Sequence, residues 1–594
     1  MQSARIRPSS LLLLAFLAAC SASESDRSDA AGAAEIADAV ARHFVDGYYH
    51  QFPEEAYEIA YPDAPMDRLG DRSVAAMDAW RAREDAWLDS LRALDPAALE
   101  GTPAATPYAF ALDRLEASVA RRACRTELWN VSPTWTGWQS MLASTLARQP
   151  VGTPAERADA LARARDVPRY LDTEVANLRH GLELGYTAPR SSVDAVLAQV
   201  DALLAADPTA SPFYEPATRT DDADFAATLR ELVVAEIRPA IRRYRDFLAG
   251  GYRPRAREVV GVAANPEGDA CYRASLRFHT SLPLEPREVH QAGLREMARI
   301  QTEMREIARR SFGTDDVPAL LERLRTDPRY TFDSEEAVLD YARAAVDRAR
   351  AAVPRWFGFV PDTRVVVRAF PAYQKASGGG FYSAGSLDGS RPGTYELGTY
   401  RPETISRAGM EATAFHETYP GHHLQMSVAL RGGAVHPILR YMYVAGTAEG
   451  WGLYSELLAD EMGLYSSDVD RLGMLSNQAL RAARLVVDPG MHALGWTRER
   501  AIRYMLDHTA ESENSVTSEV DRYIAVPGQA TAYMTGSLEI QRLRREAEER
   551  LGDAFDIREF HDRVLAGGAV TLPMLGDAID RWIEAQRRDS LPSR

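Results

Sequence analysis

The sequence predicts a mainly α-helical protein that contains one small β-sheet. Apolar residues recur at helical spacing through most of the chain, and proline and glycine separate these stretches. The segment 363–370 instead has the run of β-branched residues that is typical of a strand. With 594 residues, of which 46% are hydrophobic, the chain can bury a large core in one domain or in two subdomains.

Residues 1–20 have the features of a signal peptide. Arg5 and Arg7 form a positive segment, and the apolar run from Leu11 to Leu17 is too short to span a membrane. The run ends in Leu17-Ala18-Ala19-Cys20, which resembles a bacterial lipobox. We therefore expect cleavage before Cys20 and attachment of lipid to its sulfur. An ordinary signal peptide with an incidental cysteine is the alternative.

Residues 21–33 are small and polar, as in a flexible tether. Ser21, rather than aspartate, follows Cys20, which resembles the sorting signal for the outer membrane. Outside the signal peptide no run approaches the roughly 18 apolar residues of a membrane-spanning helix. We therefore expect a lipid-anchored protein of the cell envelope, at the outer membrane and facing the periplasm.

Residues 34–265 are expected to form an N-terminal helical subdomain. The spacing of apolar residues predicts helices over 36–49, 73–91, 112–123, 170–184, 193–205 and 224–249. Residues 250–265 lose this pattern, and Pro266-Glu267-Gly268 has the composition of a turn. The boundary to a second subdomain, 266–594, is therefore expected near residue 265.

The second subdomain is predicted to hold the sheet. A helix is expected over 285–310, where apolar residues share one face. The strand 363–370 is followed by the glycine run 378–380 and by a short strand at 394–399. The glycine run is either part of this sheet or a flexible loop.

The net charge bears on the possible partners, and the cysteine content bears on disulfide formation. The net charge of −16 and the lack of a basic stripe argue against a nucleic-acid partner. With Cys20 lipidated, Cys124 and Cys271 remain, and they either form a disulfide or stay as buried thiols. The sequence does not indicate the oligomeric state.

The segment from Phe415 to Gln425 contains three of the 12 histidines. His416 and Glu417 close a predicted helix, which is how the zinc-peptidase motif H-E-x-x-H begins. The fourth position after His416 is Pro420, which cannot bind metal. On a straight helix His422 would face away, and His423 would lie roughly 10 Å further along. If Pro420-Gly421 is a two-residue insertion, the motif ends at His422, which we prefer to His423 as second ligand.

A third ligand is expected on a later helix. Glu449 lies in an apolar helical run, where a carboxylate is costly unless it is paired or binds a metal. Two histidines, one glutamate and an open water position form a usual catalytic zinc set. The alternative is a group of surface histidines around a turn, with Glu449 in a salt bridge.

These segments resemble a known family. His416 to Gln425 and Gly446 to Tyr454 are similar to the bacterial family called domain of unknown function 885, which is grouped with the gluzincin metallopeptidases. Further similar segments are 388–393, 487–492, 519–523 and 527–533. The resemblance implies a zincin-like pair of active-site helices beside the small sheet, whose edge strand can hold an extended peptide. It also implies that a downstream His or Tyr stabilises the oxyanion.

His492 and Tyr533 are the candidates for that last role. Asp488 precedes His492 by one turn and could orient its imidazole, and a phenol such as Tyr533 can donate a hydrogen bond to an oxyanion. Tyr523 is a weaker candidate. Packing in the core is the alternative for all of these side chains.

The sequence therefore predicts a zinc-dependent hydrolase of peptide bonds. His416, His422 and Glu449 would hold Zn²⁺, and Glu417 would act as the general base for the attacking water. One alternative is a non-catalytic envelope lipoprotein that binds peptides or glycans on the same scaffold. Another is a zinc hydrolase that acts on a different bond.

Overall fold

The structure is a computed structural model of the chain, and it describes residues 10–59, 61–370, 379–385, 391–431, 435–568 and 570–589. Helices make up 73% of the chain, and the described strands form one three-stranded sheet. The predicted fold class, mainly α with a small sheet, is confirmed. Among the described helices, none combines the length and the apolar character that a membrane crossing requires.

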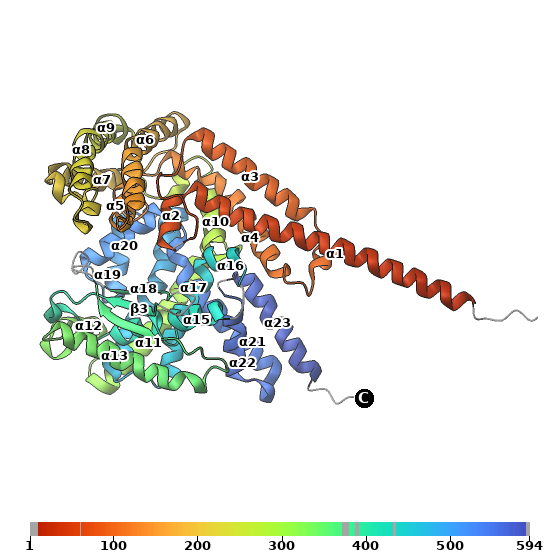
Figure 1. Cartoon of the computed structure of the whole chain (residues 1–594). Helices are drawn as coiled ribbons and strands as arrows, with labels where there is room; N and C mark the ends of the chain where they lie inside the picture. Colours follow the sequence, from red (N-terminus) through yellow and green to blue (C-terminus); the bar gives the residue numbers. More distant parts are fainter. Residues whose placement is uncertain are drawn as a thin grey trace, which may run out of the picture.

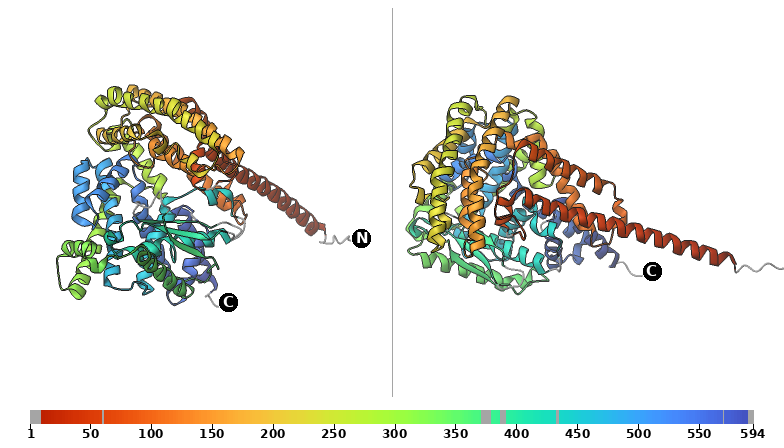
Figure 2. Two further views of the ribbon diagram at one scale, coloured as in Figure 1. Left: turned by 60° about the vertical axis from the view of Figure 1, so that its left-hand side comes forward. Right: turned by 45° about the horizontal axis from the view of Figure 1, so that its top comes forward.

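The described part of the first 265 residues is helical. In Figures 1 and 2 the helices α5 to α9 are grouped on one side of the molecule, and the N-terminal part of α1 extends away from it. The helices are α1 (Ser10–Gln51), α2 (Pro53–Glu58), α3 (Val74–Arg92), α4 (Ala105–Arg121), α5 (Trp138–Arg148), α6 (Pro154–Leu184), α7 (Arg190–Ala205), α8 (Ala223–Leu232) and α9 (Arg238–Phe247).

Two N-terminal segments differ from the prediction. Helix α1 runs through residues 21–33, for which the composition predicts a flexible tether. The alanines between residues 30 and 34 are strong helix formers and continue the helix. The predicted helix 224–249 is divided by the π-helical turn Val233–Ile237 into α8 and α9. Pro239 lacks the N–H that an uninterrupted α-helix would use, which accounts for this change.

The second half is also built mainly from helices. In Figure 1 the other helices of this half surround α17 and α18. The helices are α10 (Gly268–Thr280), α11 (Pro286–Ile307), α12 (Val317–Thr326), α13 (Glu335–Ala352), α14 (Met410–Glu417), α15 (His422–Arg431), α16 (Pro437–Tyr441), α17 (Ala445–Glu461), α18 (Asp468–Ala493), α19 (Arg498–His508), α20 (Glu513–Ala525), α21 (Ala532–Leu551), α22 (Ile557–Ala566) and α23 (Leu572–Asp589).

The sheet consists of β1 (Val365–Ala369), β2 (Gly380–Ser383) and β3 (Gly393–Leu397), in the order β1-β3-β2. The central strand β3 pairs parallel with β1 and antiparallel with β2. The two strands predicted at 363–370 and 394–399 are thus found as β1 and β3. Gly380 begins β2, so this end of the glycine run belongs to the sheet, whereas Gly378 lies outside the described residues. Strand β2 contacts α14.

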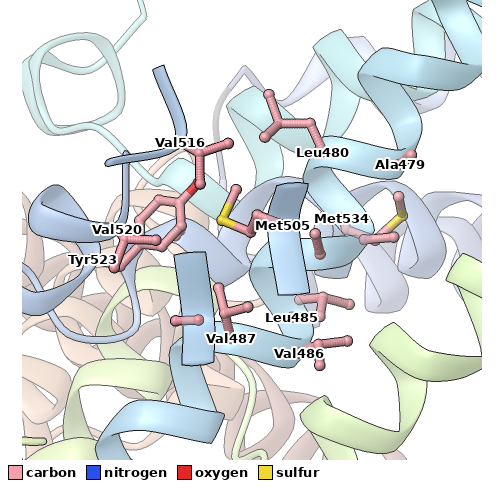
Figure 3. Packing of buried hydrophobic residues seen from close by; sticks show 14 of the residues in the cluster. Ala479, Leu480, Leu485, Val486, Val487, Met505, Val516, Val520, Tyr523 and Met534 are labelled. Carbon is pink, nitrogen blue, oxygen red and sulfur yellow. The ribbon is translucent and has the colours of Figure 1, made fainter. Parts of the chain in front are cut away.

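Helix α18 is the centre of the second half. Every residue from Ala482 to His492 is buried, which is the pattern of a helix that is surrounded by protein on all sides. Figure 3 shows Leu485 and Val487 of α18 close to Met505, Val520 and other apolar side chains of α19, α20 and α21. Because α18 is held from several directions, it provides a rigid support for α17, which it contacts.

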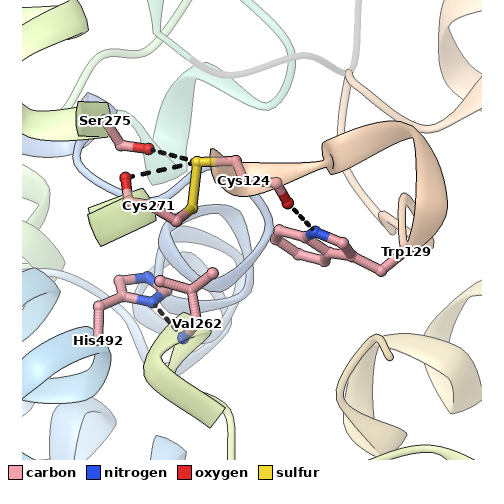
Figure 4. The surroundings of a disulfide bond; sticks show 6 residues. All are labelled: Cys124, Trp129, Val262, Cys271, Ser275 and His492. Carbon is pink, nitrogen blue, oxygen red and sulfur yellow. Dashed lines mark hydrogen bonds between the residues drawn. A yellow bond between two sulfur atoms is a disulfide. The ribbon is translucent and has the colours of Figure 1, made fainter. Parts of the chain in front are cut away.

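Apolar cores cross the predicted boundary at residue 265. Ile438 and Val444 pack in one cluster with residues of α1, α3 and α4. Cys124 and Cys271 form a disulfide, with Cα atoms 4.5 Å apart, which joins the end of α4 to α10. Figure 4 shows this bond beside Trp129, whose indole N–H donates to the carbonyl of Cys124 at 2.8 Å. The two halves therefore pack against each other directly.

Candidate metal centre

Helix α14 ends at Glu417 and α15 begins at His422, so the helix is interrupted at the proline and glycine of this segment, as the sequence predicts. Thr418 leaves the helical conformation, with φ −120° and ψ −102°. Its Oγ1 donates to the carbonyl of Ala414 at 2.6 Å and caps the end of α14. The chain then turns and resumes as a helix in a new direction, which allows the later imidazole to return toward the earlier one.

Gly421 allows the two helices to meet closely. Its N–H donates to the carbonyl of Phe415 at 3.0 Å, and a Cβ at this position would lie 1.9 Å from the carbonyl oxygen of His416. A side chain cannot approach that closely, so glycine is required here. Trp451 of α17 closes the other side of the turn, since its indole N–H donates to the carbonyl of Pro420 at 3.0 Å.

This turn brings His416 and His422 together with Glu449 of α17. The Nε2 atoms of His416 and His422 lie 3.6 Å and 3.7 Å from Oε2 of Glu449. The two imidazole rings stand edge to face, with centroids 4.8 Å apart. Within the part of the chain that the structure describes, this is the one group of three His, Cys, Asp or Glu side chains that could share an ion.

Neighbouring side chains orient the two imidazoles. Nδ1 of His416 lies 2.9 Å from Oε1 of Glu456, and Nδ1 of His422 lies 3.1 Å from Oε1 of Gln425. Gln478 in turn donates to the second oxygen of Glu456 at 3.4 Å. With each Nδ1 engaged, both Nε2 atoms are left to face Glu449, an arrangement that is typical of metal-binding histidines.

The distances from both imidazole nitrogens to Glu449 fit zinc. In a tetrahedral site with metal–ligand distances near 2.0–2.1 Å, two ligand atoms lie about 3.3–3.5 Å apart. The separations of 3.6 Å and 3.7 Å are close to this value and too long for good hydrogen bonds. Two imidazoles and one carboxylate are also a usual donor set for catalytic zinc. His416, His422 and Glu449 would therefore hold the ion after only small shifts.

Three carboxylates surround the two imidazoles and stabilise positive charge on them. Desolvation lowers the pKa of His416, but the contacts with Glu449, Glu456 and Glu417 outweigh it and raise this pKa to about 10. For His422, desolvation is likewise outweighed by Glu449, and its pKa is raised. Desolvation would raise the pKa of Glu449, yet both imidazoles hold it well below its usual range. The cluster thus favours protons or a cation at its centre.

Glu417 lies beside the three grouped side chains without being one of them. Its Oε2 accepts the backbone N–H of Tyr382 in β2 at 2.9 Å, so the sheet positions the carboxylate. Desolvation raises the pKa of Glu417, and the nearby imidazoles of His416 and His422 oppose this shift. A carboxylate that is held at the cluster and can carry a proton has the properties of a general base.

The family model described as "Bacterial protein of unknown function (DUF885)" matches residues 53–579. The chain belongs to this family. The match crosses the predicted boundary at residue 265 and contains all residues of the cluster. The family description assigns no activity.

Two solved structures share the fold of this DUF885 chain. One is "the putative lipoprotein from Colwellia psychrerythraea", with 24% identity and a TM-score of 0.86, covering 94% of this chain and 100% of its own. The other is "a putative lipoprotein of unknown function from Shewanella oneidensis", with 16% identity and a TM-score of 0.72, covering 91% and 98%.

A third solved structure is too dissimilar to indicate the fold or the activity of this chain. It is "a putative oligoendopeptidase F from Bacillus anthracis str. Ames", with 9% identity and a TM-score of 0.27, covering 82% of this chain and 91% of its own. No curated protein matches the chain. The predicted resemblance of this DUF885 protein to gluzincins therefore stays a prediction.

His423, the alternative second ligand, faces away from the cluster of this DUF885 protein. Its Nδ1 lies 2.9 Å from the hydroxyl of Tyr382, and its Nε2 lies 3.0 Å from the hydroxyl of Tyr419. Desolvation lowers its pKa to about 4, so the ring is neutral. Of the two candidates, the structure brings His422 to Glu449.

His492 is not part of the cluster, which corrects the sequence prediction. The ring is fully buried; its Nδ1 accepts the N–H of Val262 at 3.1 Å (Figure 4), and its Nε2 lies 3.0 Å from the carbonyl of Tyr523. Asp488, which was expected to orient this ring, accepts the hydroxyl of Tyr272 at 2.6 Å instead. Both ring nitrogens of His492 are used within the core, so the residue is structural.

Two tyrosines lie at the carboxylate of Glu449. Desolvation and then the charge of Glu449 raise the pKa of Tyr533, whose ring centroid is 4.7 Å from the guanidinium carbon of Arg484. Tyr443 donates its hydroxyl to Oε1 of Glu449 at 2.5 Å. Tyr443 is 52% exposed, and desolvation and the charge of Glu449 raise the pKa of its phenol well above the usual value.

Sequence reasoning missed Glu456, Gln425 and Tyr443. Glu456 lies seven residues after Glu449, which is two turns along the same face of an apolar helix, and this spacing could have revealed it. Gln425 follows His422 by three residues, a weaker signal because glutamine is common on helices. Tyr443 precedes α17 in a short connection, and no local pattern links it to the cluster.

Proposed function

We propose that this protein is a zinc-dependent hydrolase of peptide bonds. The convergence of His416, His422 and Glu449 from three helices, with Glu417 beside them, carries the proposal. Structural zinc sites usually have four protein ligands, whereas catalytic sites have three and leave a position for water or substrate. His416, His422 and Glu449 are three protein ligands, as in a catalytic site.

The side chains around the cluster would divide the chemistry. When bound, zinc would polarise the scissile carbonyl and lower the pKa of the attacking water. Glu417 would accept the proton from that water and pass it to the leaving amine. The phenol of Tyr533 would donate a hydrogen bond to the negative charge that develops on the carbonyl oxygen, while Tyr443 would hold the carboxylate of Glu449. Glu456 and Gln425 would keep both imidazoles oriented throughout.

An extended peptide is the substrate class that the sheet favours. Strand β2 lies at the edge of the order β1-β3-β2, and its Tyr382 directs a backbone N–H to Glu417. In a strand, the N–H and C=O of one residue point to the same side, so this edge of β2 faces the general base. A peptide that pairs with β2 would therefore bring a carbonyl close to Glu417 and the cluster.

A lipid on Cys20 would anchor this hydrolase in the cell envelope. The segment Leu17 to Cys20 resembles a lipobox, and the two structural relatives are each described as a lipoprotein. Ser21 after the cysteine supports sorting to the outer membrane. The proposed place of action is therefore the periplasmic face of that membrane.

Zinc analysis combined with a peptide-library digest tests the proposal. We expect one zinc ion per chain and cleavage that a chelator abolishes and added zinc restores. Full zinc without cleavage would reject peptide hydrolysis and leave a different bond as the target. A protein that holds much less than one zinc ion and cleaves nothing would be a binding protein on a metallopeptidase-like scaffold.

A further inference from the structure

Two arginines of α4, Arg114 and Arg121, have no carboxylate partner among the residues that the structure describes. Arg114 is 4% exposed, and its hydrogen bond goes to a neutral acceptor, the carbonyl of Phe278, at 2.9 Å. Within the described residues, Arg121 makes no hydrogen bond and no ion pair. The guanidinium carbons of Arg114 and Arg121 lie 4.2 Å and 4.4 Å from the centroid of the Phe278 ring.

The carboxylates whose charges act on these arginines, Asp113 and Glu55, are already paired. Asp113 forms an ion pair with Arg277. Glu55 accepts the hydroxyl of Tyr48 at 2.6 Å and lies 3.6 Å from a nitrogen of Arg72. The two guanidinium groups on α4 are therefore an excess of positive charge, and the burial of a charge such as that of Arg114 is costly unless an anion pairs with it.

His279 adds an imidazole to this pair of guanidinium groups. Its Nε2 is buried, and no described residue forms a hydrogen bond with it. Desolvation and the charges of Arg121 and Arg114 hold its pKa well below the usual value, so the ring is neutral and can donate one hydrogen bond. Desolvation also lowers the pKa of both arginines. We call Arg114, Arg121 and His279 the cationic cluster.

The cationic cluster is carried by helices that lead to the metal centre. His279 directly precedes Thr280, and a Cβ on Gly446 of α17 would lie 2.8 Å from the carbonyl oxygen of Thr280. Gly446 is three residues before Glu449 on the same helix. Helices α10 and α17 are thus in contact at a point between the cationic cluster and the proposed zinc ligands.

We propose that Arg114 and Arg121 bind a carboxylate of the substrate, either the C-terminal carboxylate or an acidic side chain of a peptide. A guanidinium can bind a carboxylate through two parallel hydrogen bonds, and no described residue uses the donors of Arg121. The choice of a peptide carboxylate rests on the proposed peptide hydrolysis, whereas the anion site itself does not. The protein would therefore select substrates by a negative charge held apart from the bond that is cleaved.

Matched peptides test this selectivity. Peptides of one cleavable sequence are prepared with a free or amidated C-terminus and with Glu or Gln at one position. The zinc-loaded enzyme should cleave the charged member of one pair with about 10- to 100-fold higher kcat/KM, mainly through KM, and the pair that differs identifies the carboxylate. Arg121→Gln should abolish the preference. Equal rates on all peptides, or a preference that Arg121→Gln keeps, would overturn the proposal.

The matched control is Arg243→Gln. This change removes one positive charge from an exposed pair with Asp172 on the surface, and it should leave the preference intact. Loss of the preference in this control as well would show that net charge, rather than the cationic cluster, governs selection, and would also overturn the proposal. Circular dichroism of each variant shows whether the fold is retained.

A binding measurement separates this proposal from the hydrolase proposal. Calorimetry on the full-length Glu417→Gln variant is performed with the same peptides and with inorganic phosphate. Tighter binding of the charged peptide, lost when Arg121→Gln is added, supports the anion site even if no peptide is ever cleaved. Equal binding of charged and neutral peptides would reject a carboxylate site. Tighter binding of phosphate than of the charged peptides would reject it as well.

Discussion

Glu417 is next to a proposed zinc ligand in sequence but is held by the sheet rather than by the ion. We expect Glu417→Gln to lower kcat by about 10²- to 10⁴-fold, the usual contribution of a general base, while the zinc content stays the same. The amide can still accept the N–H of Tyr382 and cannot take a proton. Steady-state kinetics and metal analysis on the same preparation measure both quantities.

The control for this change is Glu403→Gln. Glu403 is an exposed acid that pairs with Arg401 on the surface, so its replacement should alter neither quantity. Full activity in Glu417→Gln would remove the general-base assignment. Loss of zinc from it would make Glu417 a ligand instead.

Glu456 would act on the proposed zinc ion through His416. It contacts Nδ1 of His416 at 2.9 Å and is fully buried. Replacing it by Gln keeps the size but removes the charge that supports the imidazole. We expect Glu456→Gln to weaken zinc affinity by about 10- to 100-fold, measured by competition with a chelating dye. An unchanged affinity would show that Glu456 has no part in holding the metal.

Two buried histidines make stability depend on pH. Desolvation lowers the pKa of His492 to about 4 and that of His561 to about 3. A histidine with a lowered pKa in the folded state contributes stability that is fully present above pH ~6.5 and is lost as the pH falls toward the folded value. Each histidine should therefore lower the free energy of unfolding by about 2 kcal/mol between pH 7 and pH 5, a loss that the raised pKa values of Glu174 and Asp488, both about 7, oppose.

Urea unfolding at both pH values measures this effect. The variant His492→Gln should unfold more easily at pH 7, because hydrogen bonds to Val262 and Tyr523 are lost or weakened. The difference in stability between the wild type and the variant should shrink by about 2 kcal/mol from pH 7 to pH 5. A pH dependence as steep as that of the wild type would show that His492 does not contribute to it.

At the scale of elements, α17 and α21 cross at glycines. A Cβ on Gly536 would lie 1.8 Å from the carbonyl oxygen of Gly446, so the helices would have to separate. We expect Gly536→Ala to destabilise the protein by about 1–3 kcal/mol and to weaken zinc binding, since α17 carries Glu449. Chemical denaturation and zinc titration measure the two effects.

The matched control is Gly250→Ala, where a Cβ would meet nothing within 4 Å. It should leave stability within about 0.5 kcal/mol of the wild type. If Gly536→Ala were equally harmless, the close crossing of α17 and α21 would not be needed for the site.

Much of the element pattern follows from local sequence. Helical periodicity predicts α3, α4, α6, α7, α11, the second part of α1 and the segment of α8 and α9, because a buried face repeats with the helix turn. Strand β1 is evident from its β-branched residues. The break between α14 and α15 is also predictable, because Pro420 cannot continue a helix and Gly421 tolerates a close backbone contact. The split of α8 from α9 is less evident, since it depends on how the chain relaxes at Pro239.

At the scale of the whole molecule, the disulfide between Cys124 and Cys271 links residues 147 positions apart. We expect the double variant Cys124→Ser, Cys271→Ser to lose about 2–5 kcal/mol of stability, because the unfolded chain gains freedom. Denaturation of the variant and of the reduced wild type should agree. Equal stability of oxidised and reduced wild type would show that the bond contributes nothing.

The sequence by itself determined the helical class, the position of the sheet and the residue types of the proposed zinc site, because periodicity and motif spacing are local properties. Tertiary structure decided that His422 rather than His423 meets Glu449, that Glu456 and Gln425 orient the imidazoles, and that His492 belongs to the core. Such choices depend on the direction in which α15 leaves the turn at Gly421 and on which helices pack against it. They are set by contacts between segments far apart in the chain, which no local pattern records.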